Sequence, residues 1–362
     1  MQKSSARDVN IESTTPLISP IALVNKIPMT PEVEATVLSG REQIRAILNG
    51  EDDRLIMIAG PCSIHDEKAA LDYAGRLAGL AKELSDRLLI VMRVYFEKPR
   101  TTVGWKGLIY DPDLNDTFDI ESGLTRARDL LRKVGEMGVY AGTEFLDPIV
   151  PQYIAGFVSW STIGARTTES QTHRLMASGL SMPVGFKNGT DGNAQIAVDA
   201  MVSARSSHSF LGLDHEGRTA IINTTGNPDG HLVLRGGNSG PNFGMEAIEA
   251  AKAQLRKSGV RSQLLVDCSH GNSNKDHTRQ STAFKDVVSQ RLAGNTDIIG
   301  CMVESNINPG SQKLGDDPSA LEYGVSITDA CIGWDETETL LRWAHAAMNE
   351  KARLSTADAA GN

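Results

Sequence analysis

Short apolar runs with no polar residue at their centres alternate along this chain with longer segments in which apolar residues recur every three or four positions. Such runs are typical of parallel strands that are covered on both faces. The strands that we expect are 54–60, 88–94, 139–145, 157–165, 183–189, 231–237, 263–271 and 298–305. The pattern therefore predicts a parallel sheet with helices between its strands.

The segments between the runs have the spacing of amphipathic helices. From Ala70 onward, apolar residues share one helical face, namely Tyr73, Ala74, Leu77, Ala81 and Leu84. Helices are also expected around 196–201 and over 242–258 and 275–292. Eight strands alternating with helices favour an α/β fold of the (β/α)8 TIM-barrel type. A doubly wound dinucleotide fold fits less well, because no strand is followed by the GxGxxG turn.

Three segments depart from the alternation. Residues 208–227 read as a β-hairpin that turns at "DHEGR", inserted between the fifth helix and the sixth strand. Residues 1–40 precede the alternation and are expected as an N-terminal extension for regulation or subunit contact. The predicted organisation is therefore this extension, a catalytic barrel over 41–350 and a polar C-terminal tail over 351–362.

Composition narrows the class of protein. The 362 residues carry a net charge of −9 without a basic stripe, which argues against nucleic acid as a partner. Four scattered cysteines give no disulfide framework, and no apolar run reaches the length of a membrane span. The polar first residues do not resemble a signal peptide. We therefore expect a cytoplasmic protein that does not bind membranes.

Positive charge gathers where the strands end. In TIM barrels the chemistry lies at the carboxyl ends of the strands. Six cations fall at or just after those ends: Arg93, Lys98, Arg100, Arg166, Lys187 and Arg235. Any single one is more simply an exposed residue or the partner of an acid such as Glu97, Glu144 or Asp267. Six at successive strand ends suit one or two phosphorylated substrates, since Arg and Lys both bind phosphate.

A second group of strand-end residues has metal-binding chemistry. Cys62, His270, Glu304 and Asp329 follow the first, seventh and eighth strands, which adjoin one another in a closed barrel. A thiol, an imidazole and two carboxylates suit Mn²⁺, Fe²⁺, Co²⁺ or Zn²⁺ better than Mg²⁺ or Ca²⁺. The alternatives are a buried, apolar Cys62 and a His270 that caps its turn. Ligand spacing does not decide between these interpretations.

Long blocks of the sequence resemble one enzyme family. They include "AGPCSIHD", "MRVYFEKPRTTVGWKGLIYDP", "GTEFLDP", "SWSTIGARTTESQTHRLMASGLSMPVGFKNGTDG", "GNPDGHLVLRGG", "DCSHGNSNKD", "MVESN" and "YGVSITDACIGW". Together they resemble type I 3-deoxy-D-arabino-heptulosonate 7-phosphate (DAHP) synthase from about residue 21 to residue 334. The resemblance implies condensation of phosphoenolpyruvate with erythrose 4-phosphate, the first step of the shikimate pathway.

The resemblance also implies roles for individual residues. Phosphoenolpyruvate would contact Arg93, Lys98, Gly164, Ala165, Arg166, Lys187, Arg235 and His270. Erythrose 4-phosphate would contact Pro99, Arg100, Thr101 and Asp329. One divalent metal would bind to Cys62, His270, Glu304 and Asp329, and the catalytic residues would be Lys98, Cys62, His270 and Asp329. We expect Lys98 to be the acid, with a pKa lowered by neighbouring cations, and a water on the metal is the alternative.

The resemblance also implies feedback inhibition by an aromatic amino acid, which is frequent in this family, and assembly into homodimers or homotetramers. The matching positions here are Asp8, Ile11, Pro151, Gln152, Leu180, Ser181, Phe210, Gly212 and Ile222. The small Gly212 would leave room for a hydroxyl, which favours Tyr over Phe or Trp. The alternative is that the extension and hairpin only pack a subunit interface.

Three other functions are compatible with parts of the pattern. A related barrel would take arabinose 5-phosphate, although "KPRTTVGWKG" resembles the erythrose 4-phosphate form. A Schiff-base aldolase would use Lys187 as its nucleophile and would not need a metal. A phosphate-sensing scaffold would bind ligands without releasing phosphate.

Overall fold

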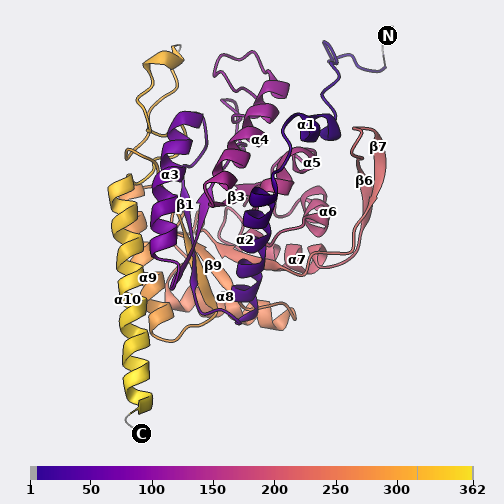
Figure 1. Cartoon of the computed structure of the whole chain (residues 1–362). Helices are drawn as coiled ribbons and strands as arrows, with labels where there is room; N and C mark the ends of the chain where they lie inside the picture. The colour runs from indigo at the N-terminus through magenta and orange to yellow at the C-terminus, as the bar shows by residue number, and fades with distance from the viewer. Residues whose placement is uncertain (1–5, 316, 361–362) are drawn as a thin grey trace.

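A closed barrel of eight parallel strands forms the centre of the molecule (Figure 1). The computed structural model describes residues 6–315 and 317–360. Around the barrel the strands follow the order β1-β10-β9-β8-β5-β4-β3-β2. They span Leu55–Gly60 (β1), Leu88–Arg93 (β2), Tyr140–Glu144 (β3), Trp160–Ile163 (β4), Val184–Lys187 (β5), Gly230–Leu234 (β8), Leu264–Asp267 (β9) and Ile298–Glu304 (β10). The predicted TIM barrel is confirmed: seven of these strands lie inside the expected ranges, and β8 begins one residue before its expected range of 231–237.

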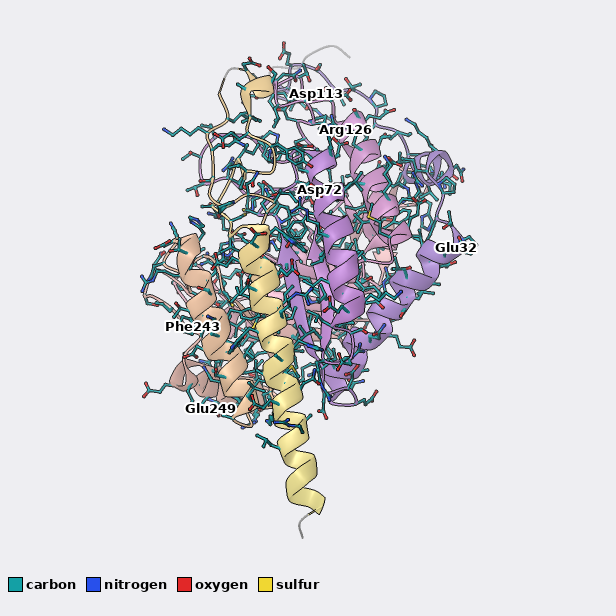
Figure 2. The ribbon with its side chains drawn as sticks, turned by 60° about the vertical axis from the view of Figure 1, so that its left-hand side comes forward. Glu32, Asp72, Asp113, Arg126, Phe243 and Glu249 are labelled. Carbon is teal, nitrogen blue, oxygen red and sulfur yellow. The ribbon has the colours of Figure 1, made fainter. Side chains whose placement is uncertain are left out.

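Helices surround the barrel and cover its outer face. They are α3 (Glu67–Glu83), α4 (Ile120–Glu136), α5 (Pro151–Ile154), α6 (Gln171–Gly179), α7 (Gln195–Ala204), α8 (Met245–Lys257), α9 (Gln280–Leu292) and α10 (Trp334–Ala360). The α3 helix starts where the Asp66 carboxylate accepts hydrogen bonds from the backbone N–H groups of Lys68 and Ala69. Between α3 and α4, Arg126 donates to Glu67 at 2.8 Å and pairs with Asp113 at 2.7 Å (Figure 2).

The helix predicted over 275–292 begins later than expected. Only 280–292 is α-helical, preceded by a 3-10 turn at His277–Arg279. Asn274 and Lys275 have φ angles of 53° and 61°, which lie in the left-handed region and cannot continue a right-handed helix. The residues before the turn therefore belong to the loop after β9.

The amino-terminal end of the barrel is covered by a helix that crosses the expected domain boundary. The α2 helix runs from Pro31 to Asn49, so residue 40 lies inside it. Its residues Ile44, Ile47 and Leu48 pack on side chains inside the barrel, which include Ile56, Ile58, Leu89, Val91, Trp160, Val233 and Leu265. Part of the predicted extension is thus continuous with the barrel core. The short α1 (Pro20–Lys26) precedes it.

The predicted hairpin is present as β6 (Ser209–Leu213) and β7 (Thr219–Asn223), which pair antiparallel. Figure 1 shows it on the outer side of α5, α6 and α7. At its tip, the backbone N–H of Ile21 in α1 donates to the carbonyl of His215 at 2.9 Å. At its base, the hydroxyls of Ser178 and Thr224 lie 2.8 Å apart. The hairpin therefore contacts α1 at its tip and the end of α6 at its base.

The carboxyl-terminal segment is helical where a polar tail was expected. The α10 helix continues through residues 351–360 and lies beside α9, and its last turns project beyond the barrel (Figure 2). Residues 361–362 of the expected tail, and 1–5 of the expected extension, lie outside the described residues. Within the described part of the chain, no helix is long and apolar enough to cross a membrane.

Candidate active site

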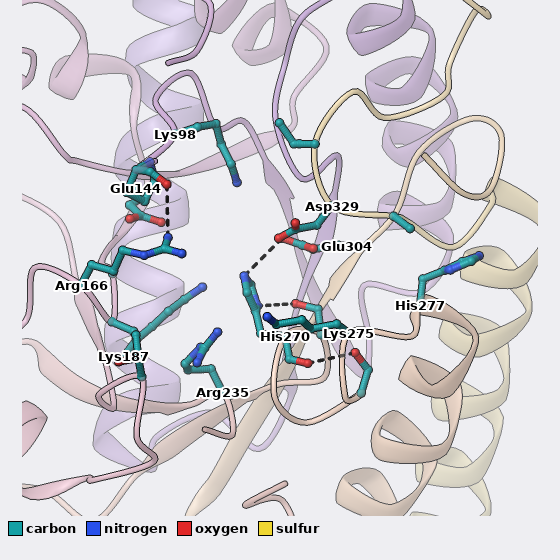
Figure 3. Close-up of a pocket in the computed structure, with 18 of the residues that line it drawn as sticks. Lys98, Glu144, Arg166, Lys187, Arg235, His270, Lys275, His277, Glu304 and Asp329 are labelled. Carbon is teal, nitrogen blue, oxygen red and sulfur yellow. Dashed lines mark hydrogen bonds and ion pairs between the residues drawn. The ribbon is translucent and has the colours of Figure 1, made fainter. Parts of the chain in front are cut away.

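The loops after the strands enclose a cavity of about 430 Å³ at the carboxyl end of the barrel (Figure 3). The predicted residues that line it are Lys98, Pro99, Arg100, Thr101, Gly164, Ala165, Arg166, Lys187, Arg235, His270, Glu304 and Asp329. They come from segments far apart in sequence, brought together because parallel strands end at the same edge. Five of the six expected cations therefore surround one cavity.

Arg93, the sixth cation, lies beneath the cavity instead of in its wall. Its side chain is 1% exposed, donates to Glu304 at 3.0 Å and to the carbonyl of Cys62 at 3.3 Å, and lies over the Tyr95 ring. A buried charge of this kind needs such partners. Arg93 thus supports Glu304 from below and is separated from the cavity wall.

Lys98 does not have the lowered pKa that we expected. Its amine donates to the Cys62 sulfur at 3.0 Å and to the Cys62 carbonyl at 3.2 Å. Burial lowers the pKa of Lys98, but the nearby acidic groups Cys62 and Glu304 outweigh burial and raise it above the ordinary value. The prediction was wrong because it counted neighbouring cations and overlooked the acidic groups beside Lys98.

Three of the four predicted metal ligands converge. The Cys62 sulfur and carboxylate oxygens of Glu304 and Asp329 all lie within 4.8 Å of one another. His270 lies beside this group, with its Nε2 atom 3.7 Å from Glu304. Burial raises the pKa of the Cys62 thiol, and the nearby Glu304 raises it further. A divalent cation would relieve this crowding of acidic groups, so the donor set fits a metal ion.

His270 is held in place by the residues before it. Its Nδ1 atom lies 2.6 Å from the Ser269 hydroxyl and 3.1 Å from the carboxylate of Asp267. Asp267 also accepts from Lys187 at 2.8 Å, and both side chains are buried. Burial alone would raise the pKa of Asp267, but Lys187 and His270 hold it well below the usual range. The imidazole is therefore oriented by an ionised carboxylate, with Nε2 directed at Glu304.

Two loops meet above the cavity through Arg166. Its guanidinium donates to the carbonyl of Pro99 at 3.2 Å and to the Thr101 hydroxyl at 3.4 Å. Arg100 donates to the carbonyl of Trp105 at 2.8 Å. The loop after β4 thus contacts the "KPRT" loop after β2, which places the two expected substrate sites side by side.

Several lining residues were absent from the predicted site. They are Glu144, Thr190, Ser269, Ser273, Lys275, His277, Gln280, Ser311, Thr328 and Ala330. Glu144 ends β3 and could have been included from its position alone. Its carboxylate lies so close to Gly164 that a Cβ there would overlap Glu144 Oε1. Only a glycine at position 164 lets the Glu144 carboxylate approach this closely.

The predicted effector positions lie away from this cavity. They fall on four segments: the turn at Asp8 and Ile11, the start of α5 at Pro151 and Gln152, the end of α6 at Leu180 and Ser181, and the hairpin at Phe210, Gly212 and Ile222. Phe210 pairs with Ile222 across the hairpin. The space beside Gly212 is not open, since a Cβ there would lie 2.6 Å from Ile222 Cγ1.

Comparison with known proteins decides the family. Residues 27–342 match the sequence model of the DAHP synthetase I family. The chain belongs to the DAHP synthetase I family. The Tyr-sensitive phospho-2-dehydro-3-deoxyheptonate aldolase of Escherichia coli (strain K12) is 51% identical over 96% of this chain and 98% of the relative. The Phe-sensitive form from the same strain is 51% identical over 92% of this chain and 95% of the relative.

A solved structure of a family member has the same fold. The phospho-2-dehydro-3-deoxyheptonate aldolase from Francisella tularensis SCHU S4 superposes with a TM-score of 0.92 and is 46% identical. The match covers 94% of this chain and 99% of that structure. This DAHP synthetase I family member is therefore an enzyme whose whole barrel matches its relatives. Tyr- and Phe-sensitive relatives are equally identical to it, so overall identity does not select an effector.

Proposed function

We propose that this enzyme condenses phosphoenolpyruvate with D-erythrose 4-phosphate and water to give DAHP and inorganic phosphate. The observation that carries the proposal is the pairing of two features in one cavity. Cationic side chains surround it, and the Cys62, Glu304 and Asp329 ligand atoms meet at its edge. Two phosphorylated substrates need the first feature, and an aldehyde that must be polarised needs the second.

In this proposal phosphoenolpyruvate occupies the part of the cavity nearest the strands. Lys98, Arg166, Lys187, Arg235 and His270 bind its carboxylate and phosphate, with backbone groups of Gly164 and Ala165 close by. Arg93 acts from beneath by holding Glu304. Bringing two anions together is costly in water, so this ring of cations supplies positioning as well as charge neutralisation.

Erythrose 4-phosphate would be held by the "KPRT" loop. Pro99, Arg100 and Thr101 line the cavity there, and Asp329 faces them from the last loop. Because Arg166 donates to both Pro99 and Thr101, the sugar would lie next to phosphoenolpyruvate. In this proposal the aldehyde then lies within reach of the enol carbon.

A divalent metal ion held by Cys62, His270, Glu304 and Asp329 would supply a Lewis acid for the aldehyde oxygen; Mn²⁺, Fe²⁺, Co²⁺ and Zn²⁺ all suit these donors. The enol carbon forms the new C–C bond, water adds to the resulting cation, and C–O cleavage expels phosphate. Lys98 is protonated at neutral pH and would donate its proton to the new hydroxyl, but its raised pKa makes it a weaker acid than an ordinary lysine; a water held by the metal would be the alternative donor.

Phosphate release tests this reaction directly. We expect release when phosphoenolpyruvate and erythrose 4-phosphate are both present, and none with either alone. Arabinose 5-phosphate as the acceptor serves as the specificity control. Release with arabinose 5-phosphate and not with erythrose 4-phosphate would replace the proposed acceptor. Tight binding of phosphoenolpyruvate without release under any metal would indicate a binding protein.

Feedback inhibition is a further part of the proposal, with tyrosine favoured over phenylalanine or tryptophan. The support is the match of Asp8, Pro151, Leu180, Phe210 and Gly212 to family effector positions, although Ile222 occupies the space beside Gly212. Gly212→Ser should then weaken inhibition by tyrosine more than by phenylalanine. Equal inhibition of the wild-type enzyme by both would contradict this choice.

We also propose that the protein forms homodimers or homotetramers. Leu211 and Ile221 are paired across the hairpin and are 81% and 70% exposed. An apolar pair this exposed supports a subunit contact at the hairpin. Sedimentation of the wild-type chain and of Leu211→Ser would test it, and a monomeric wild type would contradict it.

A further inference from the structure

Lys275 is a cavity-lining cation that the expected site leaves out. It comes from the loop between β9 and α9, and its amine points into the cavity beside His270 (Figure 3). The other lysines of the cavity are engaged, Lys98 with Cys62 and Lys187 with Asp267. In the described part of the chain no hydrogen bond or ion pair involves the Lys275 amine. Its positive charge is therefore available to a ligand.

The backbone holds Lys275 in a conformation that disfavours lysine. Its φ angle is 61°, in the left-handed region where glycine is the residue of least cost. The N–H of Lys275 donates to the carbonyl of His270 at 2.8 Å, which closes the loop. His270 itself has a φ of 54°. Both side chains line the cavity, and strain of this kind is typical of functional sites.

The position of Lys275 in the barrel indicates which ligand group it meets. Its loop follows β9, whose neighbour β8 leads into Arg235, and Figure 3 shows the amine directed toward the side of the cavity that holds Arg235 and Lys187. The "KPRT" loop follows β2, which β1 and β10 separate from β9. Lys275 thus faces the residues assigned to phosphoenolpyruvate and not those assigned to the sugar phosphate.

We propose that Lys275 binds the phosphoryl group of phosphoenolpyruvate and the inorganic phosphate that this group becomes. This inference rests on the proposed function. It adds Lys275 to the cations Lys98, Arg166, Lys187 and Arg235 that the proposed function already assigns to this ligand. It also explains why the loop keeps a lysine where glycine would cost less: the left-handed conformation directs the amine into the cavity.

Replacement of the amine tests the proposal. In Lys275→Met, we expect the dissociation constant of phosphoenolpyruvate, measured by calorimetry, to rise about tenfold to a hundredfold, as for loss of one contact to a charged group. Inhibition by inorganic phosphate should weaken by a similar factor, while KM for erythrose 4-phosphate stays within about twofold. Lys275→Arg should recover most of the affinity. Lys313→Met removes an exposed charge two residues from the cavity-lining Ser311 and should bind normally.

A second variant separates ligand binding from loop structure. Lys275→Gly relieves the left-handed backbone, so its melting temperature should equal or exceed that of the wild type. Its affinity for phosphoenolpyruvate should fall as in Lys275→Met. Unchanged affinity in both variants, or a rise confined to KM for erythrose 4-phosphate, would overturn the inference. Calorimetry needs no turnover, so a wild type that binds phosphoenolpyruvate without releasing phosphate would refute the proposed reaction and leave this test intact.

Discussion

The two ends of the barrel differ in what their side chains contribute. At the amino-terminal end, Ile44, Ile47 and Leu48 of α2 pack on Ile56, Leu89 and Trp160 in an apolar cluster. At the carboxyl-terminal end, cations and carboxylates surround an open cavity, and the buried Cys62 thiol lies beside Glu304 and Asp329. One end gains stability from burial of apolar surface, and the other gathers charges that repel or crowd one another.

Because the two ends differ in this way, substitutions at one end should affect stability and substitutions at the other should affect activity. Substitutions under α2 should lower the free energy of unfolding without altering substrate affinity. Substitutions in the exposed wall of the cavity should alter catalysis with little effect on folding. We therefore expect single substitutions at the two ends to separate stability from activity.

We expect the largest effect, a loss of phosphate release, from a substitution of Cys62. Cys62→Ala removes one ligand of the metal group and should lower metal-dependent phosphate release about a thousandfold, because the Lewis acid contributes several kcal/mol. Metal content and phosphate release measured at increasing Mn²⁺ would check this. Cys301→Ala, a buried cysteine of β10 outside the group, is the matched control. Wild-type activity in Cys62→Ala would contradict the assignment of catalysis to this end of the barrel.

The next effect is on stability at the opposite end. Ile44→Ala empties a fully buried position in the apolar cluster and should lower the free energy of unfolding by about 2–5 kcal/mol. Both KM values should stay unchanged in the folded enzyme. Urea unfolding and phosphate release would measure the two quantities. Leu38→Ala on the same helix, at a position 53% exposed, should cost far less. A changed KM in Ile44→Ala would contradict the separation.

A smaller effect, on activity alone, is expected at Arg166. Arg166→Met removes an exposed guanidinium that contacts Pro99 and Thr101, so kcat/KM should fall at least tens-fold, as for loss of one contact to a charged group. The melting temperature should change by no more than about 1 °C, because no buried group loses its partner. Steady-state kinetics and thermal unfolding provide the two readings. If Arg166→Met lowered the melting temperature strongly and left kcat/KM unchanged, Arg166 would contribute to stability and not to activity.

The smallest effect is a change with pH in the free energy of unfolding, which we expect from Glu97 at the catalytic end. Glu97 is buried and accepts from the N–H groups of Leu146 and Asp147. Burial raises the pKa of Glu97 to about 8, partly offset by these backbone donors. A carboxyl whose folded pKa exceeds its unfolded value stabilises the fold at low pH, and this contribution is lost as pH rises through the folded pKa.

Glu97→Gln removes that titration and leaves one backbone donor facing an amide N–H. The variant should therefore be less stable than the wild type at pH 6, and the difference should narrow by on the order of 1 kcal/mol by pH 8. Urea unfolding of the wild type and of Glu97→Gln at pH 6 and at pH 8 would measure this difference. A difference that stays constant with pH would show that Glu97 is ionised throughout.

Most of the fold could be predicted because each strand is a short apolar run bounded by a loop. The site followed from the same pattern, since residues after parallel strands meet at one edge. Helix boundaries were harder to predict. The helix α2 begins in a segment that precedes the strand pattern, and only its packing on Ile56 and Trp160 shows that it belongs to the barrel.

The electrostatics of single residues could not be predicted from strand position. Arg93 and Lys98 both follow β2, yet Arg93 lies under the cavity on Glu304 while Lys98 contacts Cys62. The direction of the Lys98 pKa depends on those contacts, which join residues far apart in sequence. Lys275 was missed because its left-handed backbone, and hence the direction of its amine, leaves no periodic signal.

The separation of catalysis from stability can be measured in one experiment. Phosphate release and thermal unfolding are recorded together before chelation, after chelation and again after addition of Mn²⁺. If catalysis lies at the Cys62, His270, Glu304 and Asp329 end and stability mainly at the other, release from phosphoenolpyruvate and erythrose 4-phosphate should vanish on chelation and return with Mn²⁺. The melting temperature should change only slightly. Release that persists after the metal content falls well below one per chain would contradict the account and favour Lys187 as a nucleophile.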